Sequence, residues 1–423
     1  MCKKIVAATL LSTFLLFTAC TNTSHAEIFW VEQPAAQGWH ISHPYPVANY
    51  ADGLYQVAIL EDGTGNPSSN GGMSGDFLYG YVDQYGKWLL QPQYTTTTPF
   101  VQNWAIVSII SGNEEEKQQV WQIIDKKGQV NPAFAQLVQE NIFCQETDGV
   151  FFRCGKRVES DDPFTPPTWT FGLYDCDGEE IFPPIYQKLS LPQEGLCTAK
   201  INNKFGFYDI NGNAVIPAQY ENAQNFSEGM AAVRQNGKWG FINREGTMVI
   251  APTYEEVQSF SEGFAAVKQN GQWGFVDVSG KVVIVPQYSE VKGFHEETAA
   301  VKQDEQWGVL NQRGEILIPC QYQQVQSACD GRICVQNGEY YGYFDTNGQQ
   351  CIDFLFTYAK DFHEGYAVAV NRDEQYGLID SYGKTILDFD YRYISDVTDG
   401  TAICQCKNYG KVGIVHLQEK ESF

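Results

Sequence analysis

A short phrase returns at a fixed interval along most of this chain. Tryptophan followed by glycine occurs at Trp239-Gly240, Trp273-Gly274 and Trp307-Gly308, with 34 residues between successive copies. Other copies replace the tryptophan but keep the frame, and the glycines stand at 172, 206, 240, 274, 308, 342, 377 and 413. With weaker copies at Tyr79-Gly80 and around Trp121, this periodicity predicts about ten units of one supersecondary design, and it excludes a chain of unrelated domains.

One copy, from Phe226 to Tyr254, shows what a unit contains. Met230–Gln235 is a short apolar run, and Asn236-Gly237 after it is a typical hairpin turn. Two further strands are expected at 239–243 and 249–254, separated by a turn that ends in Gly246, and a short fourth strand at 257–260. Each unit is therefore predicted to be a β-meander of three or four short strands.

Both faces of this meander carry apolar side chains. Neighbouring residues of Ala231-Ala232-Val233 point to opposite faces of a strand, so each sheet must be covered on both sides by the units before and after it. Trp239 and its equivalents are expected in this buried core, with Gly240 leaving room for an aromatic ring of a neighbouring unit. A period of 34 residues is short for a propeller blade, where about 40 is usual. We therefore expect an all-β open solenoid or superhelix, with a closed β-propeller as the alternative.

The phrase EG-x-AAV…NGKWGFI…G…VIP…Y resembles the bacterial WG-repeat (KWG-repeat) family. The resemblance is strong over residues 165–415 and weak over 45–130, and it rests on recurrence in register. It implies an all-β repeat array, in a family whose members are often exported and generally lack an assigned biochemical activity. It supplies no catalytic residues to transfer to this chain.

The period and the N-terminal pattern divide the chain into five parts. Residues 1–20 are expected to be a signal peptide, and 21–44 a linker. Degenerate repeats follow at 45–131, then an irregular insertion at 132–164, where the period is interrupted by an acidic, proline-rich stretch. The regular repeats occupy 165–423.

The N-terminus has the layout of a bacterial export signal. Lys3 and Lys4 precede an apolar run, Ile5–Phe17, that is too short to span a bilayer. Leu16-Phe17-Thr18-Ala19-Cys20 resembles a lipobox, so Cys20 is the expected lipidation site, although Phe17 stands where leucine is preferred. Alternatively, cleavage after Ala26 would release a soluble secreted or periplasmic protein. The favoured location is the cell envelope, as a periplasmic or outer-membrane lipoprotein.

Charge and cysteine usage restrict the partners. The chain has 28 basic and 51 acidic residues, a formal charge of −23, which argues against binding nucleic acid or an anionic membrane surface. Contact with a membrane is expected only through the N-terminal lipid. Ten cysteines follow Cys20, and the pairs Cys144/Cys154 and Cys329/Cys334 are candidate disulfides in an exported protein. Buried thiols are the equal alternative, since Cys197 and Cys334 align with alanines of other units.

The sequence offers no catalytic residues, no cofactor motif and no metal-ligand spacing. His295 and His363 align with serines in a turn and are interpreted as turn residues. Asp175–Gly178 is expected to be a turn rather than a calcium loop, and Gly72–Gly75 lacks the spacing of a nucleophile elbow. Acidic residues recur at one turn position and are expected to be solvated; they are Glu194, Glu228, Glu262, Asp330, Glu364 and Asp399.

These observations favour a non-enzymatic cell-envelope repeat protein that offers an extended β surface to an envelope protein or a glycan. The alternative is an envelope-polymer hydrolase whose carboxylates are assembled across repeats. A unit with polar residues clustered where other units are apolar would distinguish the two, and the sequence inspection finds none.

Overall fold

The structure is a computed structural model that describes residues 26–32, 52–60, 77–111, 118–159, 166–406 and 411–417. Cys20, the signal segment 1–20, most of the linker 21–44 and the Gly72–Gly75 segment lie outside these ranges. The regular secondary structure of the described residues consists of β-strands and a single α-helix. No helix in these ranges is long and apolar enough to cross a membrane.

The fifth unit shows how the sequence builds a regular sheet. Its strands pair in the order β16-β17-β18-β19, and all neighbours are antiparallel. A two-residue hairpin at Asn236-Gly237 joins β17 to β18, and both turn residues have positive φ. The strands are β16 (Asn222–Ala223), β17 (Met230–Gln235), β18 (Lys238–Asn243) and β19 (Met248–Tyr254). The predicted meander is confirmed.

The same sheet recurs along the chain, and we number the units 1 to 10 in chain order. Units 1 to 4 comprise β2 (Leu54–Leu60), β3 (Phe77–Asp83) and β4 (Trp88–Tyr94); β5 (Thr96–Thr97), β6 (Trp104–Ser111) and β7 (Gln118–Asp125); β8 (Ile142–Thr147), β9 (Phe151–Val158), β10 (Thr168–Asp175) and β11 (Glu180–Tyr186); and β12 (Lys188–Leu189), β13 (Leu196–Ile201), β14 (Lys204–Asp209) and β15 (Ala214–Tyr220).

Units 6 to 8 are regular, and units 9 and 10 share β35 within one seven-stranded sheet. Their strands are β20 (Glu256–Val257), β21 (Phe264–Gln269), β22 (Gln272–Asp277) and β23 (Val282–Tyr288); β24 (Glu290–Val291), β25 (Thr298–Gln303), β26 (Gln306–Asn311) and β27 (Ile316–Tyr322); β28 (Gln324–Val325), β29 (Arg332–Asn337), β30 (Tyr340–Asp345) and β31 (Gln350–Phe356); β32 (Tyr358–Ala359), β33 (Tyr366–Val370), β34 (Tyr376–Asp380) and β35 (Thr385–Ile394); and β36 (Thr401–Cys406), β37 (Val412–Leu417) and β1 (Ala26–Trp30).

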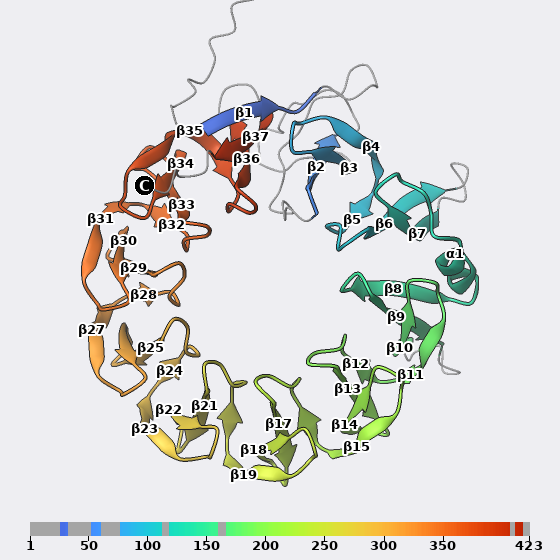
Figure 1. Cartoon of the computed structure of the whole chain (residues 1–423), viewed down its shortest axis with the longest axis horizontal. Helices are drawn as coiled ribbons and strands as arrows, with labels where there is room; N and C mark the ends of the chain where they lie inside the picture. The colour runs from blue at the N-terminus through green and yellow to red at the C-terminus, as the bar shows by residue number, and fades with distance from the viewer. Residues whose placement is uncertain are drawn as a thin grey trace, which may run out of the picture.

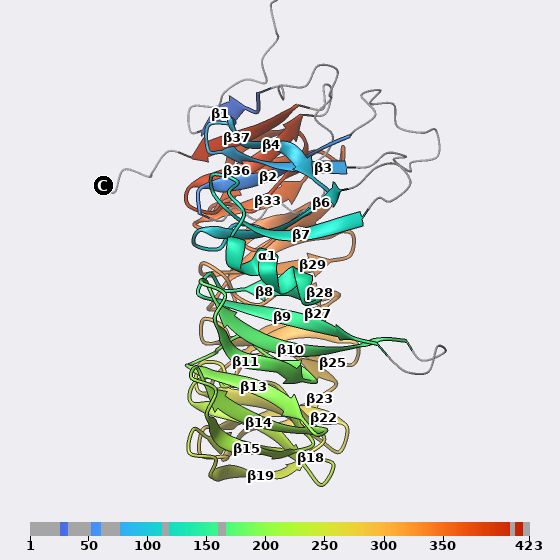
Figure 2. The same ribbon diagram turned by 90° about the vertical axis from the view of Figure 1, so that its right-hand side faces the viewer.

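The units stand side by side in a ring (Figure 1). The short first strand of each regular unit, such as β12 or β28, lies nearest the ring axis, and the last, such as β19 or β31, lies at the outer edge. Seen edge-on, the ring is much thinner than it is wide (Figure 2). The all-β array of repeated meanders is thus confirmed, with the sheets stacked face to face around the axis.

The ring is closed, which corrects our preference for an open array. Strand β1 pairs with β37 from Ala26↔Leu417 to Trp30↔Gly413 and so supplies the outer strand of unit 10. Units 1 and 10 also share a buried cluster that includes Tyr55, Val57, Ile403 and Ile414. Because each sheet is apolar on both faces, the first and last units cover each other, and the propeller alternative describes the arrangement.

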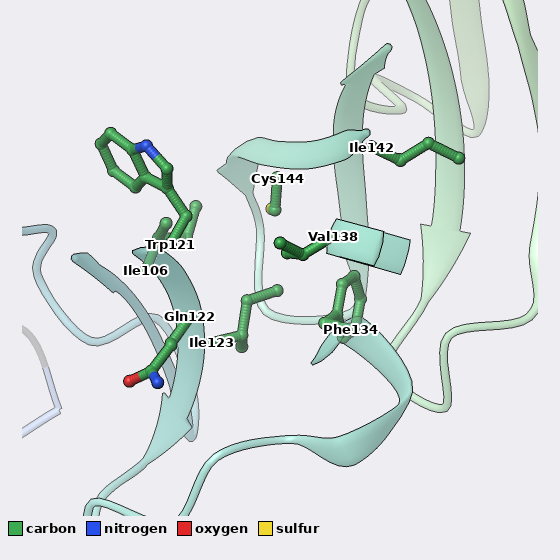
Figure 3. Close-up of a pocket in the computed structure, with 8 residues that line it drawn as sticks. All are labelled: Ile106, Trp121, Gln122, Ile123, Phe134, Val138, Ile142 and Cys144. Atoms are coloured by element: carbon green, nitrogen blue, oxygen red, sulfur yellow. The ribbon is translucent and has the colours of Figure 1, made fainter. Parts of the chain in front are cut away.

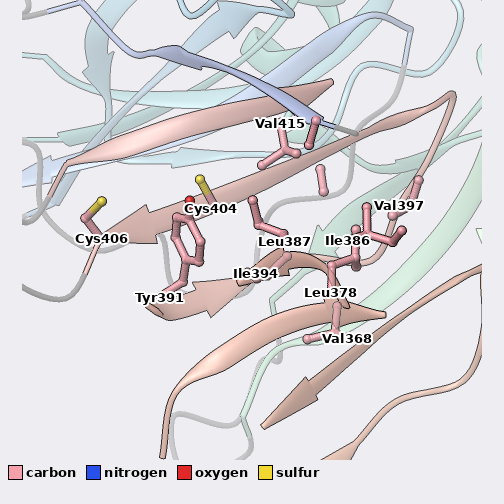
Figure 4. Packing of buried hydrophobic residues seen from close by; sticks show 12 residues of the cluster. Val368, Leu378, Ile386, Leu387, Tyr391, Ile394, Val397, Cys404, Cys406 and Val415 are labelled. Carbon is pink, nitrogen blue, oxygen red and sulfur yellow. The ribbon is translucent and has the colours of Figure 1, made fainter. Parts of the chain in front are cut away.

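Each boundary between units contains one apolar cluster. Between units 9 and 10 it includes Val368 and Leu378 on one side and Ile394, Cys404 and Val415 on the other (Figure 4). Equivalent clusters lie between the other neighbouring units. The tryptophans contribute less than expected: Trp239, Trp273 and Trp307 are half-buried and pack against the edges of these clusters.

The recurring glycine of the repeat is required for a different reason from the one expected. A Cβ at Gly206 would lie 2.6 Å from the carbonyl oxygen of Ile216 and 2.7 Å from the nitrogen of Ala218, both in the adjacent strand of its own sheet. Gly240 meets the equivalent backbone atoms. The pairing shifts register at this point, so a β-bulge in the outer strand presses on the glycine, and at Gly206 and Gly240 the nearest atoms are backbone atoms of this strand rather than a ring of a neighbouring unit.

Where the 34-residue period is interrupted, the chain forms helix α1 (Pro132–Gln139) and a modified third unit, the sheet of β8 to β11. The helix follows β7, which is the last strand of a three-stranded sheet, and packs at the outer edge of the ring between β7 and β8. Asn131 caps the helix by accepting from the Ala133 N–H at 3.1 Å. Phe134, Val138, Ile106 and Ile142 close the space beneath it, leaving a void of only about 10 Å³ (Figure 3).

Closure through β1 predicts that a charge in this strand destabilises the ring. Ile28 packs against the cluster of units 9 and 10, so Ile28→Glu should lower the free energy of unfolding by about 2 kcal/mol. The matched control is Ile185→Glu, because Ile185 also lies in an outer strand but is 52% exposed. Thermal midpoints measured by far-UV circular dichroism should fall for the first variant only; equal midpoints would contradict docking of β1.

Candidate functional site

A groove of about 670 Å³ lies along the axis side of units 3, 4 and 5. Unit 3 contributes Glu146, Asp148, Arg153 and Phe171, and the inner edge of unit 4 forms the middle. Thr198 and Phe205 of unit 4 and the β16 segment of unit 5 complete the lining. The volume is within the range of small-molecule binding sites, about 300–1,000 Å³.

Two exchanges in unit 4 account for the groove. The loop after the inner strand carries phenylalanine in most regular units. Phe260, for example, packs edge-on against Phe241 of the preceding unit, with the two ring centroids 4.9 Å apart. Unit 4 has Pro192 at this position, which has no ring to fill the space. Two residues earlier, Gln258 donates to the carbonyl of Val291 in the next unit at 3.2 Å, whereas unit 4 has Ser190, which is too short to do so.

Arg153 lies at the unit 3 end of the groove. Its guanidinium group is over the ring of Phe171, 5.1 Å from the centroid, and makes an ion pair of 3.0 Å with Glu146. A second terminal nitrogen donates to the Leu189 carbonyl at 3.5 Å. The Nε–H group is buried and has no hydrogen-bond partner among the described residues. One strong donor of Arg153 is therefore unused.

Thr198 lies in β13 and is only 7% exposed. Its backbone N–H donates to the Ser190 hydroxyl at 2.9 Å, but its own Oγ1 has no partner within the described part of the chain. A buried hydroxyl without a hydrogen bond destabilises the fold by about 1–3 kcal/mol. Such a group in the wall of a groove is a candidate contact for a ligand.

Arg153 and Thr198 occupy the same position of the repeat. Residues 154, 199 and 233 each pair with the repeat glycine, so the residues before them, Arg153, Thr198 and Ala232, are equivalent. Other units have Ala266 and Ala300 there. Two adjacent units thus carry polar side chains where units 5 to 7 have alanine, and unit 1 also has a polar residue, Gln56, at this position. The sequence inspection missed this, although aligning β9 with the regular units would have exposed it.

The recurring acidic turn residues are placed differently from the expectation that they are merely solvated. The carboxylate of Glu228 accepts from the backbone N–H groups of Glu262 and Gly263 in the next unit, at 2.6 and 2.8 Å. The same link joins Glu262 to the N–H groups of Glu296 and Glu297. Further links of this ladder start from Glu194, Glu296, Asp330 and Glu364. The ladder binds successive units together, and Glu296 is a member that the sequence analysis did not include.

Other predicted residues have structural roles. The Asp175 carboxylate accepts from the N–H groups of Asp177 and Glu179, both at 2.9 Å, so this segment is the expected turn. His295 and His363 lie in turns, where each pairs backbone to backbone with the residue three positions on. Within the described ranges, no three His, Cys, Asp or Glu side chains come together to hold a metal ion.

All ten cysteines after Cys20 are free thiols in the structure. Cys144 and Cys154 are direct cross-strand neighbours in β8 and β9, and a hydrogen bond between the thiols, together with burial, raises the pKa of Cys154. Burial raises the pKa of Cys197 and of Cys334 to about 12 each. Cys197 and Cys334 are therefore protonated core residues, as the alignment with alanines allows.

The unpaired hydroxyl of Thr198 gives a test of the groove wall. Thr198→Ala installs the residue of the regular units and should raise the free energy of unfolding by about 1 kcal/mol. The reverse exchange in a regular unit, Ala232→Thr, should lower it by about 1–3 kcal/mol. Urea denaturation with unchanged m-values would measure both effects. A destabilised Thr198→Ala variant would mean that the hydroxyl is already satisfied in the free protein.

Comparisons with solved structures return propellers and related proteins at low similarity. The WD40 β-propeller domain of Doa1 has 10% identity and a TM-score of 0.25, covering 55% of this chain and 92% of that one. Dihydro-heme d1 dehydrogenase NirN in complex with DHE has 15% identity and a TM-score of 0.32, covering 64% and 72%. YCF48 bound to D1 peptide has 8% identity and a TM-score of 0.28, covering 55% and 92%. No functional conclusion follows from likenesses this low.

No curated protein sequence matches the chain significantly. The family described as WG containing repeat, in contrast, matches at eight places, and together these cover more than half of the chain. The matches are at residues 79–109, 171–205, 205–239, 239–273, 273–307, 307–341, 341–373 and 376–409. They coincide with the repeated sheets of the ring, and the chain belongs to the family of WG containing repeat proteins.

Proposed function

We propose that this WG repeat protein is a non-enzymatic binding protein of the cell envelope, and that its partner, a protein or a glycan, binds in the groove of units 3 to 5. The observation that carries the proposal is the pair Arg153 and Thr198. Both are polar, both lie where units 5 to 7 have alanine, and each has a buried polar atom without a partner in the described structure. Ligand-binding sites commonly combine such groups with apolar walls.

The carboxylates of the groove support binding over hydrolysis. Hydrolysis of a glycosidic bond needs two carboxyl groups that flank the bond, one of them free to donate a proton. Glu146 is engaged by Arg153, and one Asp148 oxygen accepts from the N–H groups of Val150 and Phe151 in its own turn, at 3.0 and 2.7 Å. Both acids are thus used to hold the local structure together.

A test of this function is capture of a partner from envelope extract by the chain that starts after Cys20. Ser190→Gln should reach the unit 5 backbone, as Gln258 of unit 6 reaches unit 7, and so narrow the groove and abolish capture. Gln258→Ser, the reverse exchange in unit 6, is the matched control and should capture normally. Equal capture by both variants would show that the partner binds elsewhere on the ring.

We also propose that Cys20 is lipidated and anchors the ring to the envelope. The start of β1 supports this over cleavage after Ala26: Ala26 is 5% exposed and pairs with Leu417, so that cleavage would remove a buried residue from the closing strand. One lipidated residue close to β1 would tether unit 10 near the membrane surface.

The anchor predicts a change in partitioning. Wild-type protein from cells should enter the detergent phase, whereas Cys20→Ala should remain aqueous or unprocessed, because it lacks the acceptor thiol. Cys2→Ala, which removes the other N-terminal cysteine, is the control and should partition like wild type. Mass spectrometry that finds a mature N-terminus at Glu27 in the wild-type protein would contradict lipidation.

A further inference from the structure

The charges that line the groove cancel within it. Two acidic residues, Glu146 and Asp148, are matched by two basic ones, Arg153 and Lys188. Arg153 is paired with Glu146, and Asp148 is bonded to its own turn. On a chain of net charge −23, a groove without excess positive charge does not attract anionic ligands. The groove is therefore suited to a neutral ligand.

The rest of the lining combines neutral hydrogen-bonding groups with aromatic and aliphatic surface. The neutral polar residues are Gln187, Ser190, Gln193, Thr198, Asn222 and Asn225. Phe171 of unit 3 provides a half-buried ring, whereas Phe205 of unit 4 is only 6% exposed. Hydroxyl and amide groups both donate and accept hydrogen bonds, and aromatic rings pack against apolar C–H surface. A pyranose ring has hydroxyl groups around its edge and C–H groups on its faces, which matches this combination.

An extended peptide is less well matched. Peptides that bind to the edge of a sheet obtain much of their affinity from main-chain hydrogen bonds to a free strand. At the middle of the groove the inner strands are β12 and β16, each only two residues long. Backbone N–H groups beside β12 are already used within unit 4, where Gln187 and Ser190 donate to carbonyls of β13 at 2.8 and 3.0 Å. Recognition here depends on side chains.

From this chemistry we infer that the groove of units 3 to 5 binds a short neutral oligosaccharide, with the sugar hydroxyls bonded to Thr198, Arg153 and the amide side chains and a C–H face of the sugar against the exposed part of the Phe171 ring. This inference rests on the proposed binding function and narrows its partner to a glycan. Thr198 Oγ1 and Arg153 Nε, which have no partners in the described structure, obtain them in the complex.

The experiment is a titration of the purified chain with named probes. Binding is measured by isothermal titration calorimetry and by the change in tryptophan and tyrosine fluorescence. The neutral probes are cellotetraose, chitotetraose and mannotetraose; tetragalacturonate is the anionic counterpart and an uncharged heptapeptide the peptide counterpart. We expect at least one neutral oligosaccharide to bind at up to millimolar concentration, more tightly than tetragalacturonate and the peptide.

Three variants locate the binding. Ser190→Gln and Pro192→Phe each install the residue of regular units and should abolish binding by filling the groove, and Thr198→Ala should weaken it by about tenfold. Gln258→Ser in unit 6 should leave it unchanged. Because every exchange introduces a residue that another unit already has at that position, the variants should keep the thermal midpoint and spectrum of a folded ring.

The inference is overturned if none of the neutral oligosaccharides binds, if tetragalacturonate or the peptide binds more tightly, or if Ser190→Gln and Pro192→Phe bind as well as wild type. Cleavage of the oligosaccharide probes during incubation would also overturn it, because the chain would then be an enzyme rather than a binding protein. Failure here is distinguishable from failure of the proposed function: a protein captured from envelope extract by wild type, and lost in Ser190→Gln, would uphold the groove as a binding site while refuting its glycan ligand.

Discussion

Apolar side chains on both faces of each regular sheet determine the arrangement of the whole molecule. Ala231 packs towards unit 4 and Ala232 towards unit 6, so the same strand takes part in two clusters. A row of such sheets would expose one apolar face at each end, and repeat proteins that stay open need polar end units to cover them. Here the two ends cover each other through Tyr55, Val57 and Ile403, and β1 completes the last sheet. The ring needs no separate capping units.

A second set of contacts explains how the ring tolerates a groove. Every boundary from unit 4 to unit 10 also carries a carboxylate that accepts from backbone N–H groups of the next unit, and such charge-assisted bonds are stronger than neutral ones. At the boundary of units 4 and 5 the Glu194 carboxylate still accepts from Gly229 at 3.1 Å, and the cluster around Phe207 and Phe226 is intact. The exchanges at Ser190 and Pro192 therefore open the axis side while the rest of the boundary holds.

The sequence was sufficient for the unit but not for the closure. The 34-residue spacing and the Asn-Gly and Asp-x-x-Gly turns are local signals, so the meander and its strands could be predicted directly. Whether the array closes depends on small rotations between neighbouring sheets, which accumulate around the ring and leave no local mark. The pairing of β1 with β37 joins segments at opposite ends of the chain, and residues 26–30 show no repeat pattern. The groove was missed for another reason: Arg153 lies in unit 3, where α1 and an altered spacing obscure the alignment that makes Arg153 equivalent to Ala232.

The pairing of β1 with β37 also sets the order in which this protein can complete its folding. Ribosomes make Ala26–Trp30 long before Val412–Leu417, so the closing strand leaves the ribosome before its partner strand has been synthesised. Until then β1 has unpaired backbone groups and unit 1 has an uncovered apolar face, which are features that attract chaperones and other copies of the chain. Synthesis of β37 ends this exposure. Folding of this ring is thus completed by β37, and a chain whose synthesis stalls shortly before that strand would be folded in most units yet still expose apolar surface at both ends.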